Sequence, residues 1–287
     1  MKLPPLEYAC PTTLSEAVSL LASRGGDAKA IAGGQSLVPM MAFRVVAPAL
    51  LVDLRKLAEL REIKVSGEGV RLGAMVRWRD IEDDQRLADA HPLLKAAVEH
   101  VAHYQIRNRG TVGGSLAHAD PAAEMPGIAV TCDADIAVTG SSGSRVIPAQ
   151  DFFLGALTTA LEPDEIITEI KLPAWPAGRR WGFREFARRR GDFAMAAAAL
   201  FYDRDAGGGG AANAHVGIIG LGDRPLRLTE VEGVINGSAV DEATIARAAE
   251  VTSATVDAQE DIHASAAYRR SLAGTMVERA LQSAAAA

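Results

Sequence analysis

Residues 110–115 read Gly-Thr-Val-Gly-Gly-Ser, and residues 32–36 read Ala-Gly-Gly-Gln-Ser. Both segments place paired glycines beside side chains that carry hydroxyl or amide groups. Glycine allows positive φ and a close approach of the backbone to a ligand. Consecutive N–H groups can then surround an anion. The two segments are therefore suited to hold one diphosphate from opposite sides, although each Gly-Gly pair could also be an ordinary turn.

Known phosphate-binding patterns do not describe these segments. No Gly-Lys-Ser/Thr follows either of them, and neither has the spacing Gly-x-Gly-x-x-Gly. Residues 217–222 also contain three glycines, but Asp223 and Pro225 follow instead of a helix. We expect a strand end at 217–222.

Polar residues directly follow the second glycine segment. Asp120 either accepts a hydrogen bond from a sugar hydroxyl or caps a helix that begins at Pro121, and both can hold together. His118 either lines a pocket or makes a structural hydrogen bond.

The part of the chain that surrounds these two segments has the mixture of predicted helices and strands that is typical of an α/β fold. Thr13 and Glu16 form the capping-box pattern at the start of a helix. A glycine turn around Gly67 joins two alternating segments, which predicts a hairpin. The pattern predicts helices at 12–24, 93–104 and 121–131 and strands at 28–32, 49–54, 63–66, 70–73, 134–139 and 166–172.

Pro173, Pro176 and Gly178 mark a boundary, and a second region follows it. Its pattern predicts strands at 181–188, 194–202 and 212–219, with a flexible glycine loop at 207–210, and helices at 229–235, 241–255 and 263–284. We therefore expect a three-stranded antiparallel sheet with a helical layer.

Composition and charge exclude several classes of protein. The net charge of −6 argues against a nucleic-acid-binding domain. Two cysteines exclude a disulfide scaffold and an iron–sulfur cluster held by this chain alone. No apolar run is long enough to span a membrane, and the N-terminal residues do not resemble a signal peptide. We therefore expect a cytoplasmic protein.

Two further clusters are ambiguous or weak. His100 and His103 would lie one turn apart on a helix, but no third ligand follows at a suitable spacing, so we expect no metal site. Six arginines lie between residues 179 and 190. They form either a solvated strand face or a contact with a partner or an anion.

Four motifs occur in the order of a known family. They are AGGQSLVPMM (32–41), IRNRGTVGGSLAHADPAAEMP (106–126), RRRGDFAMA (188–196) and EDIHASAAYRRSLAGTMVERAL (260–281). Together they resemble the FAD-binding medium subunit of the molybdenum hydroxylases, the xanthine dehydrogenase and carbon monoxide dehydrogenase type.

The resemblance implies an α+β fold in three parts. Two N-terminal α/β subdomains, 1–56 and 57–175, would form an FAD-binding unit of the vanillyl-alcohol-oxidase (PCMH) type. A C-terminal domain of three-stranded antiparallel sheet plus helices would occupy 176–287.

The resemblance also implies residues that contact FAD. One side of the diphosphate would be held by Ala32, Gly33, Gly34, Gln35 and Ser36, and the other by Thr111, Val112, Gly113, Gly114 and Ser115. His118, Asp120 and Glu124 would lie toward the ribityl, ribose or flavin end. Asp192 and Phe193 would lie near the isoalloxazine ring. Many relatives have Tyr at position 193, so here we expect shielding of the flavin without the hydroxyl, and we assign no catalytic residue.

In such enzymes a molybdenum–pterin subunit oxidises the substrate, and electrons pass through [2Fe–2S] clusters to FAD and then to an external acceptor. Cys10 and Cys132 are too few to hold those clusters. The resemblance therefore implies a small [2Fe–2S] subunit and a large molybdopterin subunit, assembled as a dimer of heterotrimers. The alternatives are a stand-alone FAD oxidoreductase and a non-catalytic assembly factor. The substrate and the electron acceptor stay open.

Overall fold

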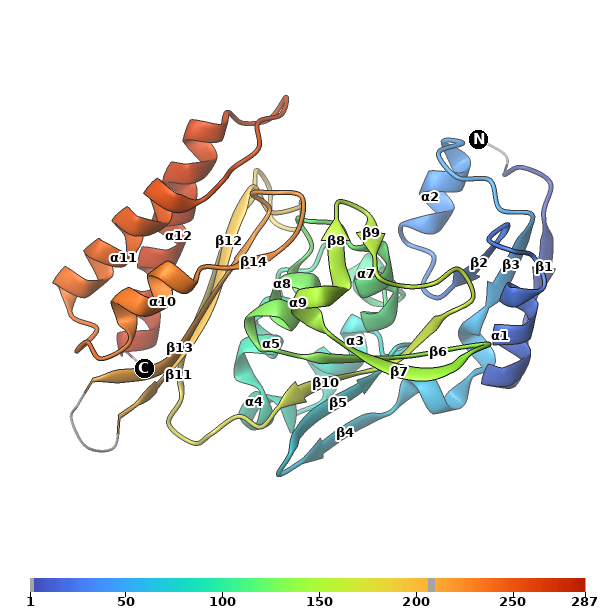
Figure 1. Cartoon of the computed structure of the whole chain (residues 1–287), viewed down its shortest axis with the longest axis horizontal. Helices are drawn as coiled ribbons and strands as arrows, with labels where there is room; N and C mark the ends of the chain where they lie inside the picture. The colour runs from blue at the N-terminus through green and yellow to red at the C-terminus, as the bar shows by residue number, and fades with distance from the viewer. Residues whose placement is uncertain (1–2, 206–209, 287) are drawn as a thin grey trace.

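The computed structural model describes residues 3–205 and 210–286 (Figure 1). Three main sheets follow one another along the chain, with helices between and over them. In Figure 1 the chain progresses from the blue N-terminal part on the right, through the green central helices, to the red C-terminal helices on the left.

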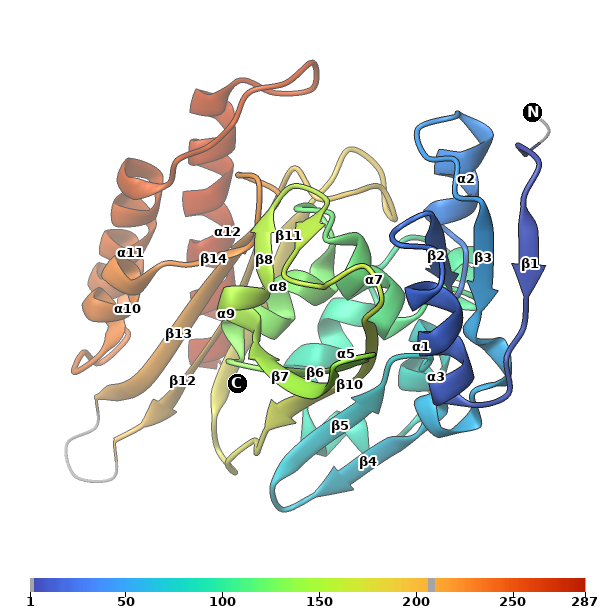
Figure 2. The ribbon, with the colours of Figure 1, turned by 45° about the vertical axis from the view of Figure 1, so that its right-hand side comes forward.

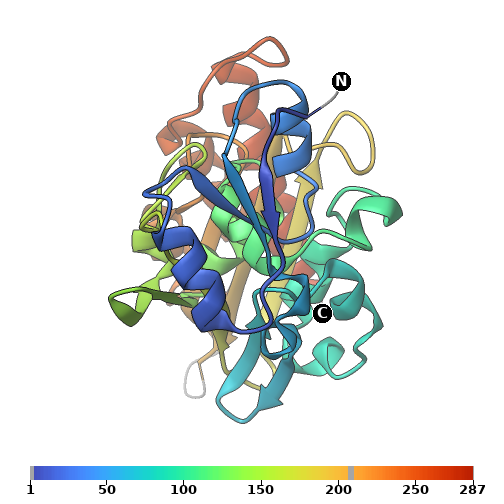
Figure 3. The same cartoon turned by 90° about the vertical axis from the view of Figure 1, so that its right-hand side faces the viewer.

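The N-terminal sheet has three parallel strands in the order β1-β3-β2. Parallel neighbours need crossover connections, which helices commonly supply. Thr13 Oγ1 accepts a hydrogen bond from the Glu16 N–H at 3.2 Å, so the first helix begins where the capping box predicts. In Figure 3 this N-terminal part faces the viewer. Its elements are β1 (Glu7–Ala9), α1 (Leu14–Ala22), β2 (Ala28–Ile31), α2 (Leu37–Ala42), β3 (Leu50–Asp53), and the 3-10 helices η1 (Leu54–Lys56) and η2 (Ala58–Arg61).

The middle sheet has five antiparallel strands in the order β4-β5-β10-β6-β7. Its strands are β4 (Ile63–Ser66), β5 (Gly69–Gly73), β6 (Asp135–Gly140), β7 (Gly143–Pro148) and β10 (Ile166–Pro173). The expected hairpin around Gly67 is present as β4 and β5. β10 lies at the centre of the sheet, although it comes last in the sequence.

Short helices and one small hairpin lie beside the middle sheet (Figure 2). These elements are α3 (Trp78–Asp83), α4 (Leu87–Ala90), α5 (Pro92–Val98), α6 (Tyr104–Arg107), α7 (Val112–His118), α8 (Glu124–Thr131), α9 (Ala149–Phe152), and the strands β8 (Phe153–Gly155) and β9 (Thr158–Thr159). α8 is buried along its whole length, because it is covered by the middle part on one side and by the C-terminal sheet on the other.

The C-terminal sheet is antiparallel, in the order β11-β12-β13-β14, and helices cover its outer face (Figure 1). Its elements are β11 (Arg180–Phe186), β12 (Ala196–Arg204), β13 (Ala211–Ile219), β14 (Leu226–Arg227), α10 (Thr229–Ile235), α11 (Glu242–Thr255) and α12 (Ala266–Ala286). Within residues 3–205 and 210–286, no helix is long and apolar enough to cross a membrane.

β12 is buried on both faces, which accounts for its alanine-rich sequence. Successive strand residues point to opposite faces. Ala196, Ala198 and Leu200 belong to the core under the C-terminal helices, whereas Ala197 and Ala199 belong to the core shared with the FAD-binding part. Small side chains let both layers approach the strand closely.

Two glycines allow α8 and α12 to pack close against the C-terminal sheet. A Cβ atom on Gly217 would lie 1.7 Å from Thr131 Oγ1 of α8. A Cβ atom on Gly182 would lie 2.1 Å from the Ala280 carbonyl oxygen of α12. Both positions therefore require glycine, even though neither has an unusual φ.

Several sequence predictions need correction. The helix expected at 93–104 ends at Val98, and Ala102 adopts φ +44° before α6 begins. The helix expected at 121–131 begins only at Glu124. A two-residue strand, β14, adds a fourth member to the predicted three-stranded sheet, and β7 was not predicted. Residues 207–209 of the expected glycine loop lie outside the described residues.

We predict that Gly182→Ala lowers the thermal unfolding temperature of the apoprotein, because α12 must move away from the sheet. The matched control is Gly233→Ala, at a position in α10 where a Cβ atom meets nothing within 4 Å. That variant should gain about 0.5–1 kcal/mol from the higher helix propensity of alanine. Equal stability of the two variants would contradict the close-packing argument.

Candidate functional site

The first glycine segment presents a row of free backbone donors. Residues 32–36 connect the end of β2 to α2 and are half-buried. In the described part of the chain, none of the N–H groups of residues 33–36 has an acceptor. Gly34 adopts φ +73°, and the Gln35 side-chain amide donates to the Gly33 carbonyl at 3.0 Å. Consecutive unsatisfied N–H groups at a turn form a concavity suited to an anion.

The two glycine segments lie against each other, although they are far apart in the sequence. A Cβ atom on Gly33 would lie 2.1 Å from the Arg109 carbonyl oxygen and 3.0 Å from Gly110 Cα. A Cβ atom on Gly114 would lie 3.8 Å from the Ala32 Cβ. The absence of a side chain at Gly33 thus lets the two backbones touch.

The second segment differs from the first, because it is the start of α7 rather than an open loop. Thr111 Oγ1 accepts a hydrogen bond from the Gly114 N–H at 3.2 Å. The Val112 and Gly113 N–H groups donate to the carbonyls of Val76 and Ala74 at 2.9 and 2.8 Å. These amides are already bonded within the protein. The remaining polar group is the half-buried hydroxyl of Ser115, which has no hydrogen-bond partner among the described residues.

α7 leads from the glycine segments to a cavity of about 600 Å³. His118, which is half-buried, lies in the last turn of α7, and Asp120 follows and lines the cavity. Asp120 Oδ1 also accepts a hydrogen bond from the Ala122 N–H at 2.9 Å. Asp120 therefore stabilises the turn before α8, and it does not cap a helix that begins at Pro121.

The cavity brings Asp120 together with Asp192 and Phe193, which come from the C-terminal domain. Phe193 is 62% exposed at this cavity, a large exposed fraction for an aromatic side chain. Of the remaining polar lining residues, the sequence analysis noted Arg188 as one of the clustered arginines and assigned no role to the others, namely Gln259, Glu260, Asp261, His263 and Arg269. The last five fall in or beside the fourth motif, which carried no assigned role. Neither glycine segment lines this cavity.

Glu124 is the first residue of α8, and its carboxyl group is buried. Its burial, and then repulsion from Glu185 and from Asp120, raise the pKa of Glu124 to about 8. A backbone hydrogen bond of Glu124 lowers the pKa, but by less than burial raises it. Glu124 is therefore protonated at neutral pH.

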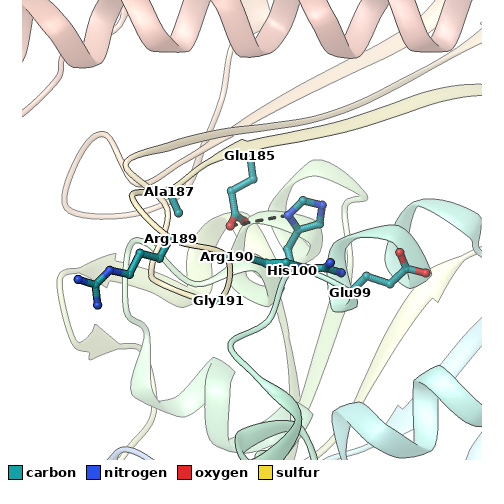
Figure 4. Close-up of a pocket in the computed structure, with 7 residues that line it drawn as sticks. All are labelled: Glu99, His100, Glu185, Ala187, Arg189, Arg190 and Gly191. Carbon is teal, nitrogen blue, oxygen red and sulfur yellow. Dashed lines mark ion pairs between the residues drawn. The ribbon is translucent and has the colours of Figure 1, made fainter.

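Glu185 lines a second, smaller cavity of about 240 Å³ (Figure 4). Its side chain is 3% exposed, and Oε1 lies 3.8 Å from His100 Nδ1. Oε2 is buried without a hydrogen-bond partner in the part of the chain that the structure describes. His100 thus faces a carboxylate and an aromatic ring, Phe183, with a centroid separation of 5.0 Å.

Three further features noted in the sequence are the pair His100 and His103, the arginine Arg179, and Cys132. Among the described residues no group of three or more His, Cys, Asp or Glu could hold a metal ion. Arg179 packs over the Phe201 ring at 4.1 Å and pairs with Asp203, and its side chain is buried, so this arginine is not part of a solvated strand face. Burial raises the pKa of the Cys132 thiol to about 12, which agrees with an inert packing role.

Two family models match consecutive parts of the chain. Residues 4–175 match the FAD binding domain in molybdopterin dehydrogenase, and residues 181–284 match the CO dehydrogenase flavoprotein C-terminal domain. The chain belongs to the FAD-binding subunits of the molybdopterin dehydrogenases. It is thus an FAD-binding medium subunit of the molybdenum hydroxylases, an electron-transfer component of oxidoreductase complexes, and its cofactor is FAD.

Relatives in this family cover nearly the whole chain. The alpha subunit of the 6-hydroxypseudooxynicotine dehydrogenase complex of Paenarthrobacter nicotinovorans is 38% identical and covers 98% of this chain and 95% of its own. The carbon monoxide dehydrogenase medium chain of Hydrogenophaga pseudoflava is 35% identical, with 98% and 97% covered.

Solved structures agree over the full length of the chain. A carbon monoxide dehydrogenase structure from Hydrogenophaga pseudoflava matches with a TM-score of 0.95 and 37% identity, and covers 100% of this chain and 99% of its own. Quinoline 2-oxidoreductase from Pseudomonas putida 86 matches with a TM-score of 0.94 and 40% identity over the same shares. The family therefore accounts for both the FAD-binding part and the C-terminal domain.

We predict that Gly34→Ala weakens FAD binding at least tenfold, because alanine disfavours φ +73° and its Cβ would lie 3.3 Å from Val38. The row of free N–H groups would then lose its alignment. Titration of FAD into the apoprotein measures the affinity. Gly25→Ala is the matched control: it has φ +54° and meets nothing within 4 Å, so it loses stability but keeps FAD affinity. Equal affinities would argue against the donor row.

We predict that Glu124→Gln stabilises the apoprotein at pH 8 but not at pH 4. Between the ordinary carboxyl pKa and about 8, the unfolded state loses this proton while the folded state keeps it, so folding becomes less favourable as pH rises. Removing the group should recover a few kcal/mol at pH 8, at about 1.4 kcal/mol per pKa unit. Denaturant unfolding at both pH values measures the difference.

Glu232→Gln is the matched control for this prediction. Glu232 is 6% exposed, as is Glu124, but it accepts hydrogen bonds from Arg227 and from the Val216 N–H. Its replacement should destabilise the protein at pH 8. A loss of stability in Glu124→Gln at pH 8 would mean that the buried Glu124 carboxyl makes a favourable contact.

Proposed function

We propose that the FAD lies along α7, with its diphosphate at the first glycine segment and its ring system at the 600 Å³ cavity. The four free N–H groups of residues 33–36 carry the proposal, because backbone donors without acceptors need an anion or water. α7 has seven residues and is therefore about 10 Å long. An elongated dinucleotide can bridge that distance, whereas a lone phosphate cannot.

In this arrangement the predicted residues have distinct roles. Ala32, Gly33, Gly34, Gln35 and Ser36 bind the diphosphate through the backbone. Thr111, Val112, Gly113 and Gly114 fix the start of α7 against that segment, and Ser115 adds a hydroxyl. His118, Asp120 and Glu124 lie toward the ribityl and ring end. Asp192 and Phe193 face the ring, and Phe193 shields it from solvent.

The FAD would supply the redox chemistry, taking up electrons and passing them to an external acceptor. The chain itself binds and orients the cofactor. We propose that its partners are a small [2Fe–2S] subunit and a large molybdopterin subunit, in a dimer of heterotrimers. The proposal is supported by relatives named as a complex subunit and as medium chains, and by the two cysteines of this chain. Both thiols are free, which favours the reducing environment of the cytoplasm.

We further propose that the FAD-binding part consists of two subdomains, 1–56 and 57–175, with the C-terminal domain at 176–287. Each range contains one main sheet, and the three hydrophobic cores centre on these sheets. Four residues of the second range pack into the first core, namely Leu57, Leu60, Met75 and Ile166. The two N-terminal subdomains would therefore hold FAD as one rigid unit.

We predict that the chain, produced together with the genes beside its own, copurifies with a large chain and a small cysteine-rich chain. The isolated chain should carry FAD, yet organic substrates should not reduce it directly. Mass spectrometry of the complex and the visible spectrum test both statements. Direct reduction of the isolated flavoprotein would favour a stand-alone oxidoreductase, and a colourless chain would favour an assembly factor.

A further inference from the structure

Arg269 is a buried cation that joins three separate walls of the larger cavity. It lies in the first turn of α12, and its side chain is 9% exposed. Nη1 donates to the Met195 carbonyl at 2.9 Å and to the Gly220 carbonyl at 2.6 Å. Nη2 donates to Asp261 Oδ2 at 2.7 Å. One guanidinium thus fixes the segments 191–195, 220–222 and 259–263, all of which line the cavity.

The fourth wall of the cavity is tied to the same network through Gly220. The Gly220 N–H donates to the Pro121 carbonyl at 3.0 Å, while its own carbonyl accepts from Arg269. Gly220 adopts φ +80°, and a Cβ atom there would lie 2.5 Å from the Ala194 carbonyl oxygen. The segment that contains Asp120 is therefore held in register with the C-terminal walls.

Asp261 is the counter-ion of Arg269 and also organises its own segment. Asp261 Oδ1 accepts hydrogen bonds from the His263 and Ala264 N–H groups at 2.8 and 3.0 Å. These donors, together with Arg269, lower the pKa of Asp261 to about 2. Its side chain is 44% exposed, whereas that of Arg269 is buried. Solvent therefore screens the negative partner more than the positive one.

The contribution of Arg269 to the stability of the fold does not explain why an arginine lies at this position. Its Nε is buried and has no hydrogen-bond partner among residues 3–205 and 210–286. An unsatisfied buried donor costs about 1–3 kcal/mol, and a buried ion pair often contributes little to stability. A planar fork with several donors nevertheless suits the simultaneous contact of three segments, which a lysine cannot reproduce.

We propose that Arg269 is a positioning residue for the cavity, and that its fixed charge favours electron uptake by the flavin ring held there. The inference rests on the proposed function, which places the ring system at this cavity. It assigns two effects to one side chain. The hydrogen-bonding fork sets the spacing of the walls, and the positive charge, only partly compensated by Asp261, raises the reduction potential of the bound cofactor.

The test uses the full chain loaded with FAD and compares Arg269→Gln with Asp261→Asn. Arg269→Gln removes the positive charge, so the midpoint potential should fall. Asp261→Asn removes the counter-ion while Oδ1 still accepts the two backbone bonds, so the potential should rise. A merely structural role would not shift the potential in opposite directions. Arg179→Gln is the matched control: its side chain is also 9% exposed and paired with an aspartate, but it does not line the cavity.

Arg269→Lys separates the two effects, because it keeps the charge and loses the fork. Its potential should stay near that of the wild type. Hydrogen–deuterium exchange of its apoprotein should be faster in segments 191–195 and 259–263 than in the wild type. Unchanged exchange in this variant would overturn the positioning role.

The outcomes distinguish this inference from the proposed function. A wild-type chain that binds no FAD contradicts the proposed function. If the wild-type chain binds FAD but the Asp261→Asn variant has no higher midpoint potential than the wild type, the inference about Arg269 is overturned. This second variant decides the question even where Arg269→Gln does not fold, because the Asp261 side chain is partly exposed and Asn keeps the oxygen that accepts the two backbone hydrogen bonds.

Discussion

The contact between the backbones at Gly33 and Arg109 is the constraint on which the site depends. A side chain at position 33 would overlap the Arg109 carbonyl, so glycine at this position lets two distant segments meet. This contact places the free N–H groups of the first segment at the start of α7. α7 then runs to Asp120 and the cavity. The position of the cavity relative to the donor row thus follows from one close approach and one short helix.

Features that depend on residues close together in the sequence can be predicted from it, whereas features that depend on distant partners cannot. The glycine segments can be recognised because paired glycines stand next to hydroxyl and amide side chains within six residues, and the capping box at Thr13 can be recognised because its spacing is short. The difference between the two segments could not be found in this way. Whether an amide is free depends on partners such as Ala74 and Val76, which lie far away in the sequence.

Local turns explain the errors in two of the predicted helices. The helix expected at 93–104 contains no glycine or proline that would interrupt it, but the chain turns after Val98 to reach α6. Pro121 is typical of a first helical turn, yet Asp120 uses its carboxylate to form a turn before α8. Arg269 escaped notice because its role requires Met195, Gly220 and Asp261, and no sequence spacing relates those three residues.

The packing of β12 limits the motion of the FAD-binding part relative to the C-terminal domain. Alternate residues of this strand belong to two different cores, one on each side of the sheet. A hinge rotation between the FAD-binding part and the C-terminal domain would open the contacts of Ala197, Ala199 and Phe201 to water, and so would be opposed by the hydrophobic effect. The packing on this face of β12 therefore resists separation of the FAD-binding part from the C-terminal domain.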